Sequence, residues 1–209
     1  MSLFLGKIHF WLYNKILCLE KAQDKIVELA KENGMPIESW MEEDFKLYGK
    51  PTGNEPLENI IDQSNIHGWL QEKIKSSELR QASLVTRILN VDQKYKDKLI
   101  EIFNKQGEEA ALEYSGQANN PEEIYNAANE FVLEGMPCDR AGRIILSTEN
   151  EIMWTLEVCL HKPYWNEVGG DVENFYELRN AWMASFVKTL NADFEYKKIE
   201  DGTYVIARV

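Results

Sequence analysis

The stretch that decides the fold runs from residue 135 to residue 165, GMPCDRAGRIILSTENEIMWTLEVCLHKPYW. Apolar and polar residues alternate across 152–160, which is the pattern of a half-buried β-strand. A second extended run precedes it at 143–148, and the residues at 149–150 lie where a tight turn belongs. The stretch therefore predicts an antiparallel hairpin.

Most of the remaining chain has the 3.6-residue apolar spacing of helices. The helices expected are 3–33, a short piece from 36, 57–75, 78–89, 92–105, 120–134 and 171–190. The last of these carries Trp182, which we expect to be buried against the sheet face of Ile152 and Trp154.

A second hairpin is predicted from alternating runs at 193–198 and 203–209, with Asp201 and Gly202 in its turn. A lone hairpin is marginal in water, so the two hairpins should pair into one four-stranded antiparallel sheet. We expect an α+β fold in a single domain, with a helical part at 1–134 and a sheet part at 135–209.

The composition restricts the classes of function. Lys and Arg number 23 against 35 Asp and Glu, a net charge of -12. Such a chain repels the phosphates of nucleic acids, so no nucleic-acid partner is expected. The apolar N-terminal stretch is interrupted by lysines and too short to span a bilayer. Three cysteines build no disulfide framework, which favours the cytoplasm.

Chemistry-bearing side chains gather in the first hairpin. With a two-residue turn, Cys138 falls opposite His161 and Arg140 opposite Cys159, and directly opposed residues share a face. Glu157 lies on the same face as Cys159 by period-2 alternation. The register therefore predicts one cluster, formed by Cys138, Arg140, Glu157, Cys159 and His161.

This cluster has three interpretations. Cys159 is a nucleophile if Arg140 stabilises its thiolate and His161 carries the proton. Alternatively, Cys138, Cys159 and His161 bind zinc, which we rank lower because no C-x-x-C spacing accompanies them. The third interpretation is structural, because free cysteines are commonly buried as small hydrophobic residues.

Two further histidines lie in a short internal repeat, IHFWLYNKI at 8–16 and IHGWLQEKI at 66–74. His9 and His67 are metal ligands if the two helices face one another, as in metal-binding helix bundles. Neither histidine has the Glu-x-x-His partner that di-iron bundles use. We favour a pair of packed helices with hydrogen-bonded histidines.

The last third of the chain resembles the L-2-amino-thiazoline-4-carboxylic acid hydrolase family and, more distantly, ligand-binding domains of the four-vinyl reductase type. The resemblance is carried by WTLEVC at 154–159, the aromatic turn at 164–165, the acidic helix from Asp171 and the closing hairpin. It implies a cysteine site at Cys159. The last strand lacks the second cysteine that this family usually carries.

Two functions follow as hypotheses. The first is hydrolysis of a cyclic or amide C–N bond, with Cys159 as nucleophile, His161 as proton carrier and Glu157 orienting His161. The residues expected to bind substrate are Arg140, Cys138, Trp154, Tyr164 and Arg179. The second is a non-catalytic sensor or carrier with an apolar pocket. A small-molecule ligand is expected in both cases, whereas the cofactor is left unknown and homo-oligomerisation stays open.

Overall fold

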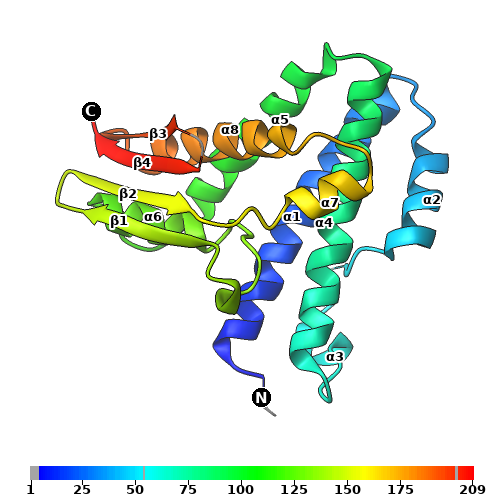
Figure 1. Ribbon diagram of the computed structural model, residues 1–209, viewed down its shortest axis with the longest axis horizontal. Coiled ribbons are helices and arrows are strands. Elements are labelled where there is room, and N and C mark those ends of the chain that lie inside the picture. The colour runs from blue at the N-terminus through cyan, green and yellow to red at the C-terminus, as the bar shows by residue number, and fades with distance from the viewer. Residues whose placement is uncertain (1–4, 54, 201) are drawn as a thin grey trace. The chain divides into compact units, whose positions relative to one another are not determined.

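The computed structural model describes residues 5–53, 55–200 and 202–209 (Figure 1). The helices are α1 (Lys7–Glu32), α2 (Ile37–Tyr48), α3 (Leu57–Ile60), α4 (Ile66–Val91), α5 (Tyr95–Glu113), α6 (Pro121–Asn129), the 3-10 helix η1 (Pro137–Asp139), α7 (Lys162–Glu167) and α8 (Val172–Leu190). The strands are β1 (Gly142–Ser147), β2 (Glu151–Leu156), β3 (Phe194–Glu200) and β4 (Thr203–Arg208). Helices thus precede an antiparallel sheet, and the predicted α+β class is confirmed.

The chain divides into two compact units. Unit 1 contains the chain up to Tyr95 together with His161–Asp171, and unit 2 contains Lys96–Leu160 and Val172–Val209. The division therefore falls after Tyr95, the first residue of α5, within the part of the chain predicted to be helical. The single domain stays a prediction.

Unit 1 is helical and is built on α1 and α4. The predicted first helix is present from Lys7 to Glu32, and its expected start at residue 3 lies outside the described residues. The predicted break between helices 57–75 and 78–89 is wrong, because α4 runs unbroken from Ile66 to Val91. Its buried Ser77 donates its hydroxyl to the carbonyl of Ile74, so the helix accommodates this serine in its interior.

The short helix α7 belongs to unit 1 and was not predicted. Pro163 occupies its first turn, where a proline costs no hydrogen bond, and Trp165 is fully buried. Just after α7, Gly170 approaches the Thr86 side chain so closely that a Cβ at this position would lie 2.2 Å from Oγ1 of Thr86.

Unit 2 contains the sheet, with strand order β1-β2-β4-β3. The two predicted hairpins pair as expected, through β2 and β4. Strand β2 ends at Leu156 instead of residue 160. The Leu156 N–H bonds to the Gly202 carbonyl, and the N–H groups of Glu157 and Val158 then share the Ala141 carbonyl, so the regular ladder stops there. The turn residue Asp201 lies outside the described residues.

The first hairpin begins in the predicted register and then shifts by one residue. Ser147 pairs with Ile152 as a two-residue turn requires. A β-bulge lies between Ile144 and Leu146, and beyond it Gly142 pairs with Leu156 instead of Glu157. The predicted alignment of Cys138 with His161 and of Arg140 with Cys159 is therefore wrong.

Helices α6 and α8 cover one face of the sheet (Figure 1). Asn120 caps α6 by accepting the Glu123 N–H, as its Asn-Pro-Glu-Glu start predicted, although the helix ends at Asn129 instead of 134. Trp182 on α8 is buried as predicted. Its aromatic contacts are Phe131 and Phe186, while α8 bonds to the sheet through Asn180 and Tyr196.

Candidate functional site

The predicted strand-face cluster does not form, because the chain before β1 is not extended. Cys138 is exposed on η1, which begins with Pro137, and the Asp139 carboxylate accepts the Met136 N–H at 2.8 Å. Arg140 follows in the left-handed region with φ of 49° and is exposed. Neither residue lies on a strand, so neither can occupy the predicted positions.

Glu157 does not orient His161 as predicted. Its carboxylate accepts a hydrogen bond from Nε of Arg143 at 2.8 Å, and both side chains are more than half exposed. The carboxylate that orients His161 is instead Glu78.

His161 is buried in unit 1 at the start of α7. Its Nδ1 lies 2.9 Å from Oε1 of Glu78 on α4, and both side chains are about 2% exposed or less. A buried carboxylate fixes the orientation and tautomer of an imidazole. Tyr164, another predicted site residue, lies half-buried in the same helix.

Cys159 lies in unit 2 after β2, half-buried, and carries the clearest chemical contact of that unit. The hydroxyl of Tyr176 on α8 donates to Sγ of Cys159 at 3.0 Å. A donor to sulfur stabilises the thiolate, which is the reactive form of cysteine. Among the predicted site residues, Cys159 therefore has the local geometry that best suits a nucleophile.

Aromatic side chains crowd the helix-covered face of the same sheet. Trp154 stacks on Tyr204, its partner across β2 and β4, with ring centroids 5.7 Å apart. Tyr196 on β3 stacks on Tyr204 in turn, and Tyr125 of α6 packs on Trp154 at 4.9 Å. The Tyr196 hydroxyl donates to Asn180 at 2.7 Å.

Arg179 has partners in unit 2 that the sequence did not indicate. Its guanidinium donates to the Glu134 carboxylate at 2.8 Å and to the Leu133 carbonyl at 2.7 Å. It also lies over the Phe175 ring, 4.7 Å from its centroid. This pairing fixes the segment that follows α6.

The phenols of Tyr176, Tyr196 and Tyr204 have raised pKa values and are held in their neutral form. Burial raises the pKa of Tyr176, and its hydrogen bond to Cys159 raises it further. Burial also raises the pKa of Tyr196, and it raises that of Tyr204 to about 12. We call Trp154, Cys159, Tyr176, Tyr196 and Tyr204 the thiol–aromatic cluster.

Sequence reasoning missed the three tyrosines of this cluster, although two of them had a signal. Tyr196 and Tyr204 occupy inward positions of the second hairpin, which become neighbours of Trp154 once β2 and β4 are paired. Tyr176 had no comparable signal, because its contact depends on where α8 crosses the sheet.

His9 and His67 meet in unit 1, as the repeat suggested. Their Nε2 atoms are 3.4 Å apart, and Nδ1 of His9 accepts the Gly6 N–H at 2.9 Å. A neutral His9 therefore carries its proton on Nε2, facing His67, which favours a hydrogen-bonded pair. Within residues 5–53, 55–200 and 202–209, no three His, Cys, Asp or Glu side chains gather to hold a metal ion.

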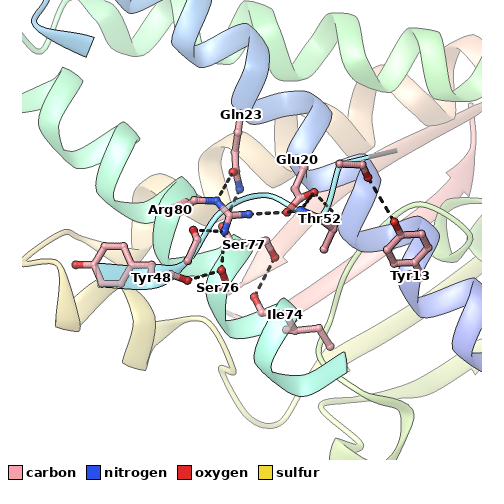
Figure 2. Close-up of polar contacts among 11 residues, drawn as sticks. Tyr13, Glu20, Gln23, Tyr48, Thr52, Ile74, Ser76, Ser77 and Arg80 are labelled. Atoms are coloured by element: carbon pink, nitrogen blue, oxygen red, sulfur yellow. Dashed lines mark hydrogen bonds and ion pairs between the residues drawn. The ribbon is translucent and has the colours of Figure 1, made fainter. Parts of the chain in front are cut away.

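The most extensive polar network of unit 1 surrounds Arg80 (Figure 2). Arg80 donates to the Glu20 carboxylate at 2.5 Å, to the Gly49 carbonyl and to the Ser76 hydroxyl. Glu20 also accepts the N–H and hydroxyl of Thr52. These contacts fasten the loop after α2 to α1 and α4, so we assign the network to stability.

Comparisons with protein-family models, curated proteins and solved structures found no match to this chain. In the part of the chain that is described, no helix has the length and apolarity needed to cross a membrane.

Proposed function

We propose that unit 2 binds a small molecule and that Cys159 attacks a cyclic or amide C–N bond of it. The observation that carries the proposal is the 3.0 Å hydrogen bond from Tyr176 to Sγ. The resemblance of residues 154–159 to the thiazoline-carboxylate hydrolases supports the same reaction class.

The proposed reaction has two steps. The thiolate of Cys159 adds to the electrophilic carbon, and the C–N bond breaks as the nitrogen takes a proton from solvent water. Water then hydrolyses the adduct and restores the thiol. Tyr176 serves as a hydrogen-bond donor to sulfur and not as a base, because its raised pKa keeps it protonated. Trp154 and Tyr204 are buried and stacked on one another, so they support the site from the sheet.

His161 and Glu157 take no part in this mechanism, although the sequence predicted them as proton carrier and orienting carboxylate. His161 is hydrogen-bonded to Glu78 within unit 1, and Glu157 is ion-paired with Arg143. The proposal depends only on side chains of unit 2.

Alkylation of Cys159 by iodoacetamide, followed by mass spectrometry of the peptide, tests the proposal. We expect labelling near neutral pH that slows about tenfold in Tyr176→Phe, because the thiolate loses a charge-assisted hydrogen bond. Exposed Cys138 is an internal control whose labelling should not change. A Cys159 that stays inert, or that reacts equally in both proteins, contradicts the proposal.

A non-catalytic sensor or carrier is the second candidate, and the stacked rings of Trp154, Tyr196 and Tyr204 favour it. Native mass spectrometry of protein from its own source would identify a retained ligand. Cys159→Ser should keep that ligand under both functions. Turnover of the ligand by the wild type, lost in Cys159→Ser, would establish the enzyme over the carrier.

A further inference from the structure

Strand β1 forms one edge of the described sheet, and it exposes apolar side chains. All six of its residues are exposed, and Ile144, Ile145 and Leu146 are 44%, 44% and 37% accessible. An edge strand presents backbone N–H and C=O groups that can pair with another strand. An apolar edge of this kind is normally protected in proteins that stay monomeric.

The opposite edge, β3, carries that protection (Figure 1). Its central residues include Glu195, Lys197, Lys198 and Glu200, and charged side chains discourage strand addition. Between Gly142 and Ser147, β1 carries a single charge, on Arg143. Both edge strands carry a β-bulge, so the two edges differ in charge, and β1 is the one suited to pairing.

We propose that β1 pairs antiparallel with β1 of a second copy of this chain, joining two sheets across a two-fold axis. Antiparallel pairing centred on Leu146 places Arg143 of one copy opposite Glu149 of the other, twice by symmetry. Arg143 bonds to Glu157 of its own chain through Nε, and its guanidinium has further N–H groups that can donate to Glu149. This charge complementarity favours a second copy over an unrelated strand.

Apolar residues continue inward from this edge, and their exposure falls from Leu146 to the buried Val205. Leu146 pairs with Met153, and Met153 pairs with Val205, so a row of apolar residues crosses the sheet face opposite to Trp154. In the joined sheet, the two rows meet at Leu146. Because the strands are short and each chain carries a net charge of -12, we expect a weak, concentration-dependent dimer at about 0.15 M salt.

Sedimentation equilibrium of the full chain over a range of concentrations tests this inference. Ile145→Lys is expected to weaken dimerisation about tenfold or more, because it places a charge at the edge. Ile199→Lys is the matched control, since Ile199 is also exposed and also lies at a bulge, but on β3. It should leave dimerisation unchanged, and circular dichroism should show that both variants are folded.

Charge reversal gives a second, independent test of the two-fold arrangement. Arg143→Glu or Glu149→Arg alone should weaken the dimer, and the two together should restore it. A wild type that remains monomeric up to about 500 μM, well above the range of specific complexes, overturns the proposal. So does a dimer that Ile199→Lys dissociates and Ile145→Lys does not.

Discussion

Arg80 shows how a single residue stabilises unit 1 through fully buried charge. Its guanidinium is 2% exposed and meets Glu20, also buried, with further hydrogen bonds to Ser76 and the Gly49 carbonyl (Figure 2). Burial lowers the pKa of Arg80, and the Glu20 charge opposes this effect. Charges of this kind are tolerated only when their partners are in place.

We therefore expect Arg80→Ala to destabilise the protein by about 3–5 kcal/mol, because the Glu20 carboxylate is left buried without its cation. Urea unfolding measures the loss. The double variant Arg80→Met with Glu20→Gln should recover much of it. Lys31→Ala is the exposed control, since it breaks the surface pair with Glu38 and should cost less than about 1 kcal/mol. Equal losses for Arg80→Ala and Lys31→Ala would refute this explanation.

His9 should make stability depend on pH. It is 3% exposed, and burial lowers its pKa from the ordinary 6.5, with the nearby His67 lowering it further. The folded state then binds fewer protons than the unfolded state between the lowered value and 6.5. Stability should therefore be full above pH 6.5 and decrease as the pH falls through this window.

Urea unfolding between pH 8 and pH 5 measures this effect. His9→Gln should flatten the decrease, and His67→Gln should reduce it only in part, because the burial of His9 remains. An unchanged pH profile in His9→Gln would show that other groups cause it.

At the level of elements, most of the fold could be predicted and the site could not. Alternation and turn signals correctly placed both hairpins, because these patterns are local. No local sequence pattern marks the bulge near Ile145. The bulge shifts the β2 partner of each preceding β1 residue by one position from the predicted register. The cluster predicted around Cys138 and Arg140 depended on that register. The contacts of Cys159 and His161 depend on α8 and α4, far away in sequence.

Helix α5 illustrates tertiary packing overriding a local stop signal. Gly107 was expected to end a helix at about residue 105, yet α5 continues to Glu113. A Cβ at Gly107 would lie 2.4 Å from the backbone carbonyl oxygen of Trp182. The glycine is thus present for the close approach of α8 and does not terminate the helix.

Gly107→Ala should therefore destabilise the protein, although alanine is the better helix former by about 1 kcal/mol. The backbone of α8 must move to admit the methyl group, and we expect a net loss of about 1–3 kcal/mol. Thermal unfolding compared with Glu109→Ala, an exposed position on the same helix, separates packing from propensity. A Gly107→Ala protein more stable than wild type would show that the two helices separate at little cost.

On the scale of the whole molecule, the chain crosses between its two units three times. It leaves unit 1 after Tyr95, returns for His161–Asp171 and ends in unit 2. The returning segment contributes Trp165, which is fully buried, and His161, which pairs with Glu78. Unit 1 therefore needs the segment 161–171, which lies far along the sequence from the other residues of the unit.

A fragment of residues 1–95 should consequently fail to fold. It lacks α7, so it loses the packing of Trp165, a loss of the order of 3–5 kcal/mol for a large aromatic side chain. It also leaves the Glu78 carboxylate without the His161 imidazole. Joining residues 161–171 to this fragment through a flexible linker should restore cooperative unfolding by circular dichroism and dispersed amide resonances. The same linked fragment carrying Trp165→Ala should lose that recovery. If residues 1–95 alone unfold as cooperatively as the linked fragment, α7 is not required for the fold of unit 1.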